Sequence, residues 1–501
     1  MTVALRSARG ARTADVVLVS DRGPVTFRAT PSGPTPERRT GSVTALLDRS
    51  ARALDGDVYW LAPSASEEDR GAVRDGRFAG LGLGYEFRPV PFRAADYRRY
   101  YEDAGVRGLW YALHDLWADL PRGLDDGGPG PLGDGAALRA YQRVNRGVAA
   151  AAATYCRPRT VVCFQDYQFA TAPGFLRSLL PTQTVGLFVH AAFAGPSALA
   201  ALPDAARGLL LRGMLAADVL GFQCERWADS FLRFAGEAGH EVDAAAGTVR
   251  HAGGRTLVRR YPAPPDQEYL SGVFGAADAD RWSGVFGRLR EGAGRGARLL
   301  VRVDRLDPAK NVLRGFEAFA LLLAERPRLR HSVRFVCCLT PSRPAVPEYA
   351  WYAARVREAV AAIQRDHPGV LTVYWEEDRV RAMAALREYD VLLVNSVHDG
   401  MNLVAQEGVL VNRRDGAVVL SARTGSAERL GAGAVVVDDP RDVRETAAAL
   451  GRALAMPPDE RAARAGRMRE PLLATSPESW LRAQLADLAE VRDRRFQGRR
   501  S

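Results

Sequence analysis

Short runs of apolar residues recur along the chain, separated by polar loops and by longer stretches with helical periodicity. In the first half, such runs cover residues 16–20, 160–164 and 185–189, and each is almost wholly apolar rather than alternating. A strand that is apolar on both faces is typical of a parallel sheet covered by helices on both sides. The pattern therefore predicts an α/β fold with buried parallel strands.

The same alternation of strands and helices starts again in the second half. Helical patterns at 204–216 and 226–235 lie before the proline-rich stretch 261–266 (YPAPPD), which has the composition of a linker. We therefore predict two doubly wound domains, residues 1–264 and 265–475, followed by a C-terminal helix and basic tail over 476–501. The pattern does not show where that helix packs. The apolar runs of the second half are residues 299–303, 333–338, 371–374, 391–394, 417–420 and 434–437.

Length and composition fit this division and exclude several classes of protein. The chain has 501 residues, 47% hydrophobic and 26% charged. Single cores stop growing at roughly 250 to 300 residues, so two domains are expected. Five cysteines without metal-type spacing argue against a disulfide scaffold and a structural zinc site, so we expect no metal. There is no signal-peptide pattern, and prolines interrupt the uncharged run 179–203, so we expect a soluble, cytoplasmic protein without membrane contact.

The net charge of +10 is concentrated at the two ends of the chain. Residues 1–13 carry three arginines and no acid, and residues 492–501 carry five arginines and one aspartate, so the ends supply +7. Solvated basic tails account for such a distribution, and no basic motif interleaved with aromatic residues occurs between them. We therefore expect no nucleic-acid partner.

A single lysine, Lys310, stands among 69 basic residues. It lies in the segment 302–311 (RVDRLDPAKN), just past an apolar run, together with Arg305. A lysine ammonium is a compact point charge, whereas an arginine presents a planar fork, so a lone lysine can mark a place that needs the former. Two cations at a strand end could neutralise a diphosphate leaving group without a metal ion. The alternative is a salt-bridged surface turn.

Polar residues also follow other predicted strands. In HDGMNLVAQE (398–407), Gly400 would let backbone N–H groups approach a phosphate at a helix start, and Glu407 could accept ribose hydroxyls. An ordinary turn is the alternative for that segment. Asp166 and His190 each close a strand and suit recognition of sugar hydroxyls, although an isolated histidine of this kind is more often a hydrogen-bonded core residue.

Six segments lie in a specific order along the chain: SDRGPV (20–25), TGSVTAL (40–46), QDYQ (165–168), FVH (188–190), DRLDPAKN (304–311) and DGMNLVAQE (399–407). They resemble SNRLPV, GGLVTAL, VQDYH, FLH, DRLDYTKG and DGMNLVAKE of the trehalose-6-phosphate synthase family, which are retaining glycosyltransferases of family 20. The resemblance implies the GT-B fold, in which two Rossmann-like domains face each other across the active-site cleft. It also implies metal-independent transfer of glucose from a nucleotide sugar to glucose 6-phosphate, with no cofactor.

The resemblance further implies a role for each matching residue. The acceptor phosphate would be bound by Arg22, Tyr101, Trp110 and Arg343, and the catalytic residues would be Asp166, His190, Arg305 and Lys310. The donor would be bound by Gly41, Arg305, Lys310, Asp399, Gly400, Met401, Asn402, Leu403, Val404 and Glu407. The implied mechanism is front-face transfer with retention, in which the departing phosphate oxygen takes the proton of the incoming hydroxyl.

Some positions depart from the family pattern and leave alternatives open. Gln168, Pro308 and Asn311 resemble validoxylamine 7'-phosphate synthase, a pseudo-glycosyltransferase that couples an activated cyclitol to an aminocyclitol phosphate. Tyr101, Trp110 and Met401 instead keep the glycosyltransferase pattern. The segment HAAFAG (190–195), which replaces HIPFPS, suggests a non-catalytic sugar-phosphate-binding regulator as a further alternative. The expected partners are a nucleotide-sugar donor and a sugar-phosphate acceptor. The donor base and a homo-oligomer are left open.

Overall fold

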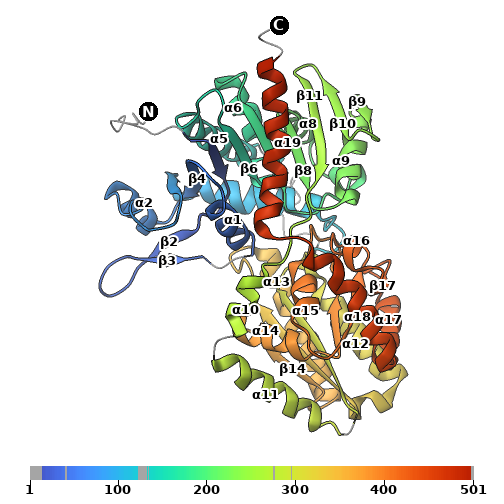
Figure 1. The fold of residues 1–501 in the computed structure, drawn as a ribbon. Coiled ribbons are helices and arrows are strands. Elements are labelled where there is room, and N and C mark those ends of the chain that lie inside the picture. The colour runs from blue at the N-terminus through green and yellow to red at the C-terminus, as the bar shows by residue number, and fades with distance from the viewer. Residues whose placement is uncertain are drawn as a thin grey trace.

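The computed structural model describes residues 14–39, 42–121, 132–133, 135–274, 277–294 and 296–497. Its elements form two α/β domains, drawn one above the other in Figure 1. Each domain is built around a largely parallel sheet with helices on both faces, as the apolar strand pattern predicts.

The first domain contains a sheet of nine strands. Seven neighbouring strands pair in parallel, and β10 and β9 extend the sheet at one edge through antiparallel pairings. The strand order reverses between β1 and β6, since the chain first adds strands on one side of β1 and then on the other. In spatial order, the strands are β5 (Glu86–Pro91), β4 (Val58–Ser64), β1 (Val16–Val19), β6 (Val161–Gln165), β7 (Thr184–Val189), β8 (Val219–Phe222), β11 (Gly254–Arg260), β10 (Thr248–His251) and β9 (Glu241–Asp243).

The second domain contains a sheet of six strands, all parallel. Its strand order reverses between β12 and β15. In spatial order, the strands are β14 (Leu371–Tyr374), β13 (Val333–Thr340), β12 (Arg298–Arg305), β15 (Val391–Val394), β16 (Ala417–Ser421) and β17 (Val435–Val437). A separate hairpin of β2 (Val25–Arg28) and β3 (Thr35–Arg38) projects from the first domain (Figure 1).

Helices cover both faces of each sheet, and no described helix is long and apolar enough to cross a bilayer. In the first domain they are α1 (Ser42–Arg52), α2 (Glu67–Arg74), α3 (Ala94–Arg98), η1 (Arg99–Trp110), α4 (Tyr111–Leu113), α5 (Ala136–Ala153), η2 (Tyr167–Phe169), α6 (Ala172–Leu179), α7 (Pro196–Leu199), α8 (Asp204–Leu215) and α9 (Glu225–Glu237). From there on they are α10 (Gln267–Phe274), α11 (Ala277–Glu291), η3 (Pro308–Lys310), α12 (Val312–Glu325), η4 (Pro327–His331), α13 (Pro347–Asp366), α14 (Arg379–Glu388), α15 (Leu403–Val411), α16 (Ala427–Leu430), α17 (Val443–Ala455), α18 (Pro458–Leu473) and α19 (Pro477–Gln497).

The last helix, α19, returns to the first domain, which the sequence pattern could not show. It lies along the first sheet in Figure 1 and packs against α1 and β7. Gly186 in β7 makes room for it, because a Cβ at that position would lie 2.8 Å from the Leu488 side chain. Trp480 donates from Nε1 to the carbonyl oxygen of Tyr261 at 2.9 Å. The chain therefore passes between the domains twice.

Candidate functional site

The candidate site lies where the strand ends of the two sheets meet. Arg22 follows β1 and Asp166 follows β6, so these residues flank the reversal in the first sheet. Lys310 follows β12 and Asp399 follows β15, at the reversal in the second sheet. Open α/β sheets bind ligands in the crevice at such reversals. Four of the predicted site residues are thus brought to the places where a ligand is expected.

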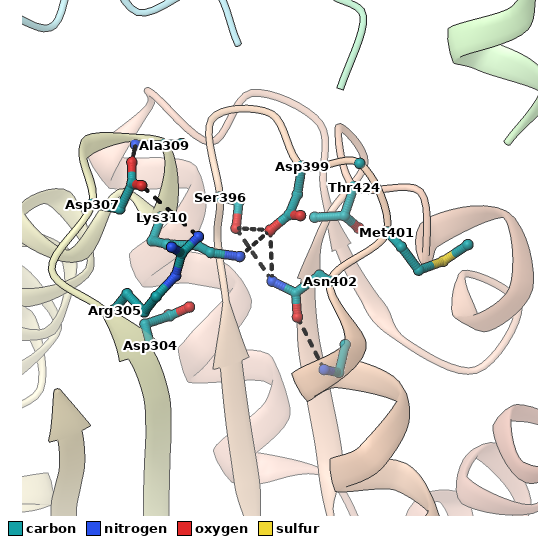
Figure 2. Close-up of polar contacts among 12 residues, drawn as sticks. Asp304, Arg305, Asp307, Ala309, Lys310, Ser396, Asp399, Met401, Asn402 and Thr424 are labelled. Carbon is teal, nitrogen blue, oxygen red and sulfur yellow. Dashed lines mark hydrogen bonds and ion pairs between the residues drawn. The ribbon is translucent and has the colours of Figure 1, made fainter. Parts of the chain in front are cut away.

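Lys310 and Asp399 form an ion pair across the second reversal (Figure 2). Lys310 Nζ lies 2.5 Å from Asp399 Oδ2, and the same oxygen accepts from Asn402 Nδ2 at 2.9 Å and from Ser396 Oγ at 3.3 Å. Burial by itself would raise the pKa of Asp399, but the charge of Lys310 and these hydrogen bonds outweigh it and lower the pKa. The Asp399 carboxylate is therefore ionised at neutral pH.

The turn that carries Lys310 is held by Arg302, a residue to which the sequence analysis assigned no role. Arg302 lies in β12 with 1% of its side chain exposed, and its Nε is 3.0 Å from Asp304 Oδ2. Its Nη1 donates to Asn395 Oδ1 at 2.7 Å and its Nη2 to the carbonyl oxygen of Lys310. Gly315 leaves room for this guanidinium, since a Cβ there would lie 2.3 Å from Arg302 Nη1. A buried arginine therefore fixes the main chain beneath the site lysine.

The loop before α15 crosses to the first domain at Gly400. A Cβ on Gly400 would lie 1.7 Å from the carbonyl oxygen of His190, so only glycine permits this approach. The carbonyl of Gly400 accepts from Trp227 Nε1 at 2.9 Å. The loop that holds Asp399 is therefore packed directly against the end of β7.

Asn402 begins α15 with φ at +67°, and its Oδ1 accepts from the N–H of Ala405 at 3.0 Å. Leu403 and Val404 are the first residues of the helix, so their N–H groups have no carbonyl partner within it, and a helix start favours anions. Met401 is buried beside this loop.

Two further predicted donor residues, Glu407 and Arg305, differ in their exposure to solvent. Glu407 is buried one turn into α15, and Arg379 Nη2 donates to its Oε1 at 3.2 Å. Burial raises the pKa of Glu407 despite that partner. Arg305, with 47% of its side chain exposed, comes no closer than 4.0 Å to Asp307 Oδ2. Its guanidinium is thus open to solvent beside the Lys310 pair (Figure 2).

Tyr101 and Trp110 share a π-helical segment, η1, that spans Arg99–Trp110. They are nine residues apart, which in an α-helix of 3.6 residues per turn would place them about 180° apart. A π-helix, with about 4.4 residues per turn, brings them back to nearly the same side. Segments of this kind occur frequently at functional sites. The wider helix explains how both side chains can serve one predicted phosphate site.

The predicted acceptor residues form two contacts that lie close together. In the first, Arg22 Nη2 donates to the Tyr101 hydroxyl at 3.0 Å. In the second, the Arg343 guanidinium lies over the Trp110 ring, with its carbon 5.1 Å from the ring centre. Arg343 Nη1 also donates at 2.7 Å to Asp307 Oδ2, so the second domain contributes side chains to the predicted acceptor site.

No sequence motif assigns a role to Asp307, yet it links the predicted acceptor residues to the turn that carries Arg305 and Lys310. It is fully buried, and besides Arg343 it accepts from Trp110 Nε1 at 3.4 Å and from the N–H of Ala309 at 3.1 Å. Burial would raise its pKa, but the charges of Arg343 and Arg305 outweigh burial and lower the pKa to about 2. Asp307 directly precedes Pro308, and such a pair is equally typical of an ordinary turn. The sequence alone therefore does not indicate that Asp307 pairs with Arg343.

Asp166 has a strained backbone and a heavily used carboxylate. Its φ is +77°, and its Oδ1 accepts from the N–H groups of Tyr167, His190 and Ala191 at 2.9, 3.0 and 3.1 Å. Burial raises the pKa of Asp166 to about 6, against those hydrogen bonds. The residue thus ties the end of β6 to the end of β7 through one oxygen, and its second oxygen has no hydrogen bond to a described residue.

His190 lies at the strand end where it is predicted, but its ring is turned into the protein. Its Nε2 is 3.0 Å from Gln165 Oε1, and Gln223 Nε2 is 3.3 Å from its Nδ1. Burial lowers its pKa to about 3, so the ring is neutral. With both nitrogens paired to glutamines, the ring has the hydrogen-bonded core arrangement, and its predicted catalytic role remains a prediction.

His114 is another buried histidine at the site that the sequence analysis passed over. Its ring lies against that of Trp110, tilted by 31° with 3.7 Å between ring centres, and its Nδ1 is 3.0 Å from the Trp110 carbonyl oxygen. Burial lowers its pKa to about 4. The residues other than glycine with positive φ in the described chain are Asp115, Asp166, Asn311, Arg343, Asn402 and Asp415. All of them except Asp415 lie in or next to segments that carry site residues, and strained backbone of this kind clusters at functional sites.

Two predictions remain, namely Gly41 as a donor residue and the absence of a bound metal. Gly41, the remaining predicted donor residue, lies outside the described residues. Among the residues that are described, no group of three or more His, Cys, Asp or Glu side chains is arranged to hold a metal ion.

Comparisons with known proteins show what the whole chain is similar to. The sequence profile of glycosyltransferase family 20 matches residues 15–490. The chain is 31% identical over 488 residues to a validamine 7-phosphate valienyltransferase of Streptomyces hygroscopicus subsp. jinggangensis, covering 95% of this chain and 94% of that protein. It is 30% identical over 483 residues to a bifunctional trehalose-6-phosphate synthase/phosphatase of Thermoproteus tenax, covering 93% of this chain but only 62% of that protein's length.

The fold also matches solved structures. The crystal structure of a UDP-forming α,α-trehalose-phosphate synthase from Burkholderia xenovorans superposes with a TM-score of 0.77. The two are 26% identical in sequence, and the match covers 95% of this chain and 99% of that one.

Proposed function

The chain belongs to glycosyltransferase family 20, and from that premise we propose that it transfers glucose, with retention, from a nucleotide-glucose donor to glucose 6-phosphate. The product would be trehalose 6-phosphate. The single observation that carries the proposal is the Lys310–Asp399 pair at a strand reversal, close in the chain to Asp307, which contacts the arginine and aromatic residues predicted to bind the acceptor.

We call the predicted donor residues of the second domain the donor half of the site, and the predicted acceptor residues the acceptor half. In the donor half, each charged group has a role that fits such a transfer. Lys310 and the exposed Arg305 would neutralise the diphosphate as it leaves, which is worth several kcal/mol where water is excluded. Asp399 would accept hydroxyls of the transferred glucose, and the N–H groups at the start of α15 would lie around it. Glu407 would accept the ribose hydroxyls. Because cations of the protein balance the leaving group, we propose that the reaction needs neither a metal nor a cofactor.

In the acceptor half, Arg22, Tyr101, Trp110 and Arg343 would bind the phosphate of glucose 6-phosphate, and Asp166 would accept a sugar hydroxyl through its second oxygen. The attacking hydroxyl forms a bond to the anomeric carbon on the face from which the phosphate departs. The departing phosphate oxygen takes the hydroxyl proton, so charge and atoms balance without a separate base. Hydrolases that retain configuration instead need two carboxylates about 5 Å apart.

A second candidate is a pseudo-glycosyltransferase that couples a nucleotide-activated cyclitol to an aminocyclitol phosphate. Gln168 is the observation that favours it. Its Oε1 is buried without a hydrogen-bond donor among the described residues, and an amine acceptor carries more donors than a hydroxyl does. The valienyltransferase, whose printed name describes such a transfer, is as similar in sequence as the synthase relative.

The test is a donor–acceptor matrix read by mass spectrometry. UDP-, GDP- and ADP-glucose are each incubated with glucose 6-phosphate and the purified protein, and Lys310→Ala serves as the inactive control. A disaccharide phosphate from any donor supports the synthase and identifies the nucleotide. Product only with an aminocyclitol phosphate acceptor would favour the second candidate. Nucleotide-sugar binding without turnover under any acceptor would point to a regulator.

We place the activity in the cytoplasm, which suits five cysteines with no disulfide between them.

A further inference from the structure

Arg39 lies close to Arg22, one of the predicted acceptor-phosphate residues, although no family motif assigns it a function. It directly follows β3, and its N–H donates to the carbonyl oxygen of Pro24 at 2.9 Å. Pro24 is two residues from Arg22, so the hairpin β2–β3 folds Arg39 back beside the predicted phosphate residue. The hairpin thus brings together two arginines that are 17 positions apart.

The Arg39 side chain has no paired counter-ion among the described residues, and Asp21 and Asp69 act on its charge only from beyond ion-pair distance. Its Nε is buried with no hydrogen-bond partner, and its guanidinium forms no ion pair with any described carboxylate. Burial and then the positive charge of Arg22 lower its pKa, which means that the two cations lie close enough to repel. The neighbouring carboxylate of Asp21 already accepts from the hydroxyls of Tyr97 and Tyr100, the latter at 3.0 Å.

Arg38, the preceding residue, shows what an ordinary arginine of this hairpin does. It is exposed to solvent, and its Nη1 lies 3.4 Å from Asp48 Oδ2. The two arginines therefore differ in one respect that matters here: Arg38 has a carboxylate partner, whereas Arg39 is partly buried without one. A buried polar group is normally paired, so an unpaired guanidinium beside another cation is a place that an anion would stabilise.

We propose that Arg39 acts with Arg22 as a clamp for a phosphate group, namely that of the acceptor. This inference rests on the proposed function. A phosphate dianion offers three oxygens, which suits two guanidinium forks better than one. Among the described residues, Arg22 donates only to the hydroxyl of Tyr101, so neither guanidinium has to break an ion pair in order to bind. The same chemistry is present in the donor diphosphate, so the test must separate the two substrates.

The test compares Arg39→Ala and Arg39→Gln with Arg38→Ala. Loss of a charge-assisted bond should raise KM for the acceptor about 10-fold to 100-fold in both Arg39 variants, with kcat within about threefold. KM for the donor should not change, and Arg38→Ala should match the wild type. Arg39→Lys should restore part of the affinity. Circular dichroism and melting curves show whether each variant is folded.

Two results would overturn the inference: an unchanged acceptor KM in the folded Arg39→Gln variant, or a rise confined to the donor KM, which would assign Arg39 to the diphosphate. Binding of glucose 6-phosphate and of inorganic phosphate by calorimetry, without donor, separates this inference from the proposed function. If the wild type binds both and Arg39→Ala loses both while no turnover occurs, the clamp stands and the function fails. If turnover is normal in Arg39→Ala, the function stands and the clamp fails.

Discussion

The two halves of the site differ in how their charged side chains are paired. In the donor half, Lys310 is already paired with Asp399, and a hydroxyl and an amide hold the same carboxylate oxygen. In the acceptor half, Arg343 is paired with Asp307, but Arg22 donates only to a tyrosine hydroxyl and Arg39 forms no ion pair with a described residue. The Lys310–Asp399 pair is therefore preorganised, whereas Arg22 and Arg39 are two neighbouring cations without a paired carboxylate.

This difference suggests which property each half contributes. A fixed ion pair can be placed where charge develops during reaction, and it need not reorganise at that moment. An uncompensated pair of guanidinium groups binds an anion without first losing a partner, so it contributes affinity. Changes in the donor half should therefore act mainly on kcat, and changes in the acceptor half mainly on KM for the sugar phosphate. The following predictions test that division, from the largest effect to the smallest.

Replacing Lys310 should have the largest effect. In Lys310→Ala, the leaving diphosphate loses a cation and Asp399 loses its counter-ion, so kcat should fall about 1,000-fold or more. Lys310→Arg, which keeps the charge but not the compact shape, should recover only part of the rate. Steady-state turnover with the donor found in the matrix measures both. A folded Lys310→Ala protein with turnover within tenfold of the wild type would contradict the assignment.

Asp307→Asn should disturb the acceptor half next most strongly. Arg343 would keep its place beside Trp110 but lose its buried carboxylate, so KM for glucose 6-phosphate should rise about 30-fold. The folded-state pKa of Asp307, about 2, lies below the unfolded value of 3.8. The carboxylate therefore contributes about 2 kcal/mol of stability above pH 4, which is lost as the pH falls towards 2. Urea unfolding at pH 7 should show that loss in the variant, and an unchanged unfolding curve would argue against the paired Asp307.

Asp307 also shows where sequence reasoning reaches its limit. The parallel strands and the polar residues at their ends could be predicted, because apolar runs and strand-end chemistry are local features. The partners of Asp307 are 36 and 197 residues away, and no local pattern encodes such contacts. The same applies to the π-helical turn that aligns Tyr101 with Trp110, and to the two glutamines that hold His190. Helix α19 could be predicted as a helix but not placed, since its packing depends on the glycine in β7.

The pH dependence of turnover should reflect the ionisation of the Asp166 carboxyl group. Its pKa of about 6 in the folded protein lies above the ordinary value, so the carboxylate is protonated below pH 6 and loses acceptor capacity there. If Asp166 accepts a sugar hydroxyl, kcat/KM for the acceptor should fall up to tenfold for each pH unit below about 6. Asp166→Asn should be slower at pH 8 and lack this acid limb. A wild-type profile that is flat from pH 5 to 8 would remove Asp166 from the acceptor site.

The smallest effect is expected at a contact that joins the halves without touching substrate. Glu428, in α16 of the second domain, accepts from the N–H groups of Glu225 and Arg226 at the start of α9, both at 3.0 Å. Glu428→Ala removes this helix cap, which is typically worth about 1 kcal/mol. Ser66→Ala is the matched control, because Ser66 caps α2 within the first domain only, through the N–H of Asp69 at 3.0 Å.

The two variants should lower the melting temperature by similar small amounts, but only Glu428→Ala should alter how the halves cooperate. With the cap gone, the domains lose one hydrogen-bonded link, so kcat should fall about twofold while the KM values for both substrates rise together. Steady-state kinetics with both substrates varied would detect this. If Ser66→Ala produced the same kinetic change, the cap would act through stability alone, and the division between the two halves would not depend on this link between the domains.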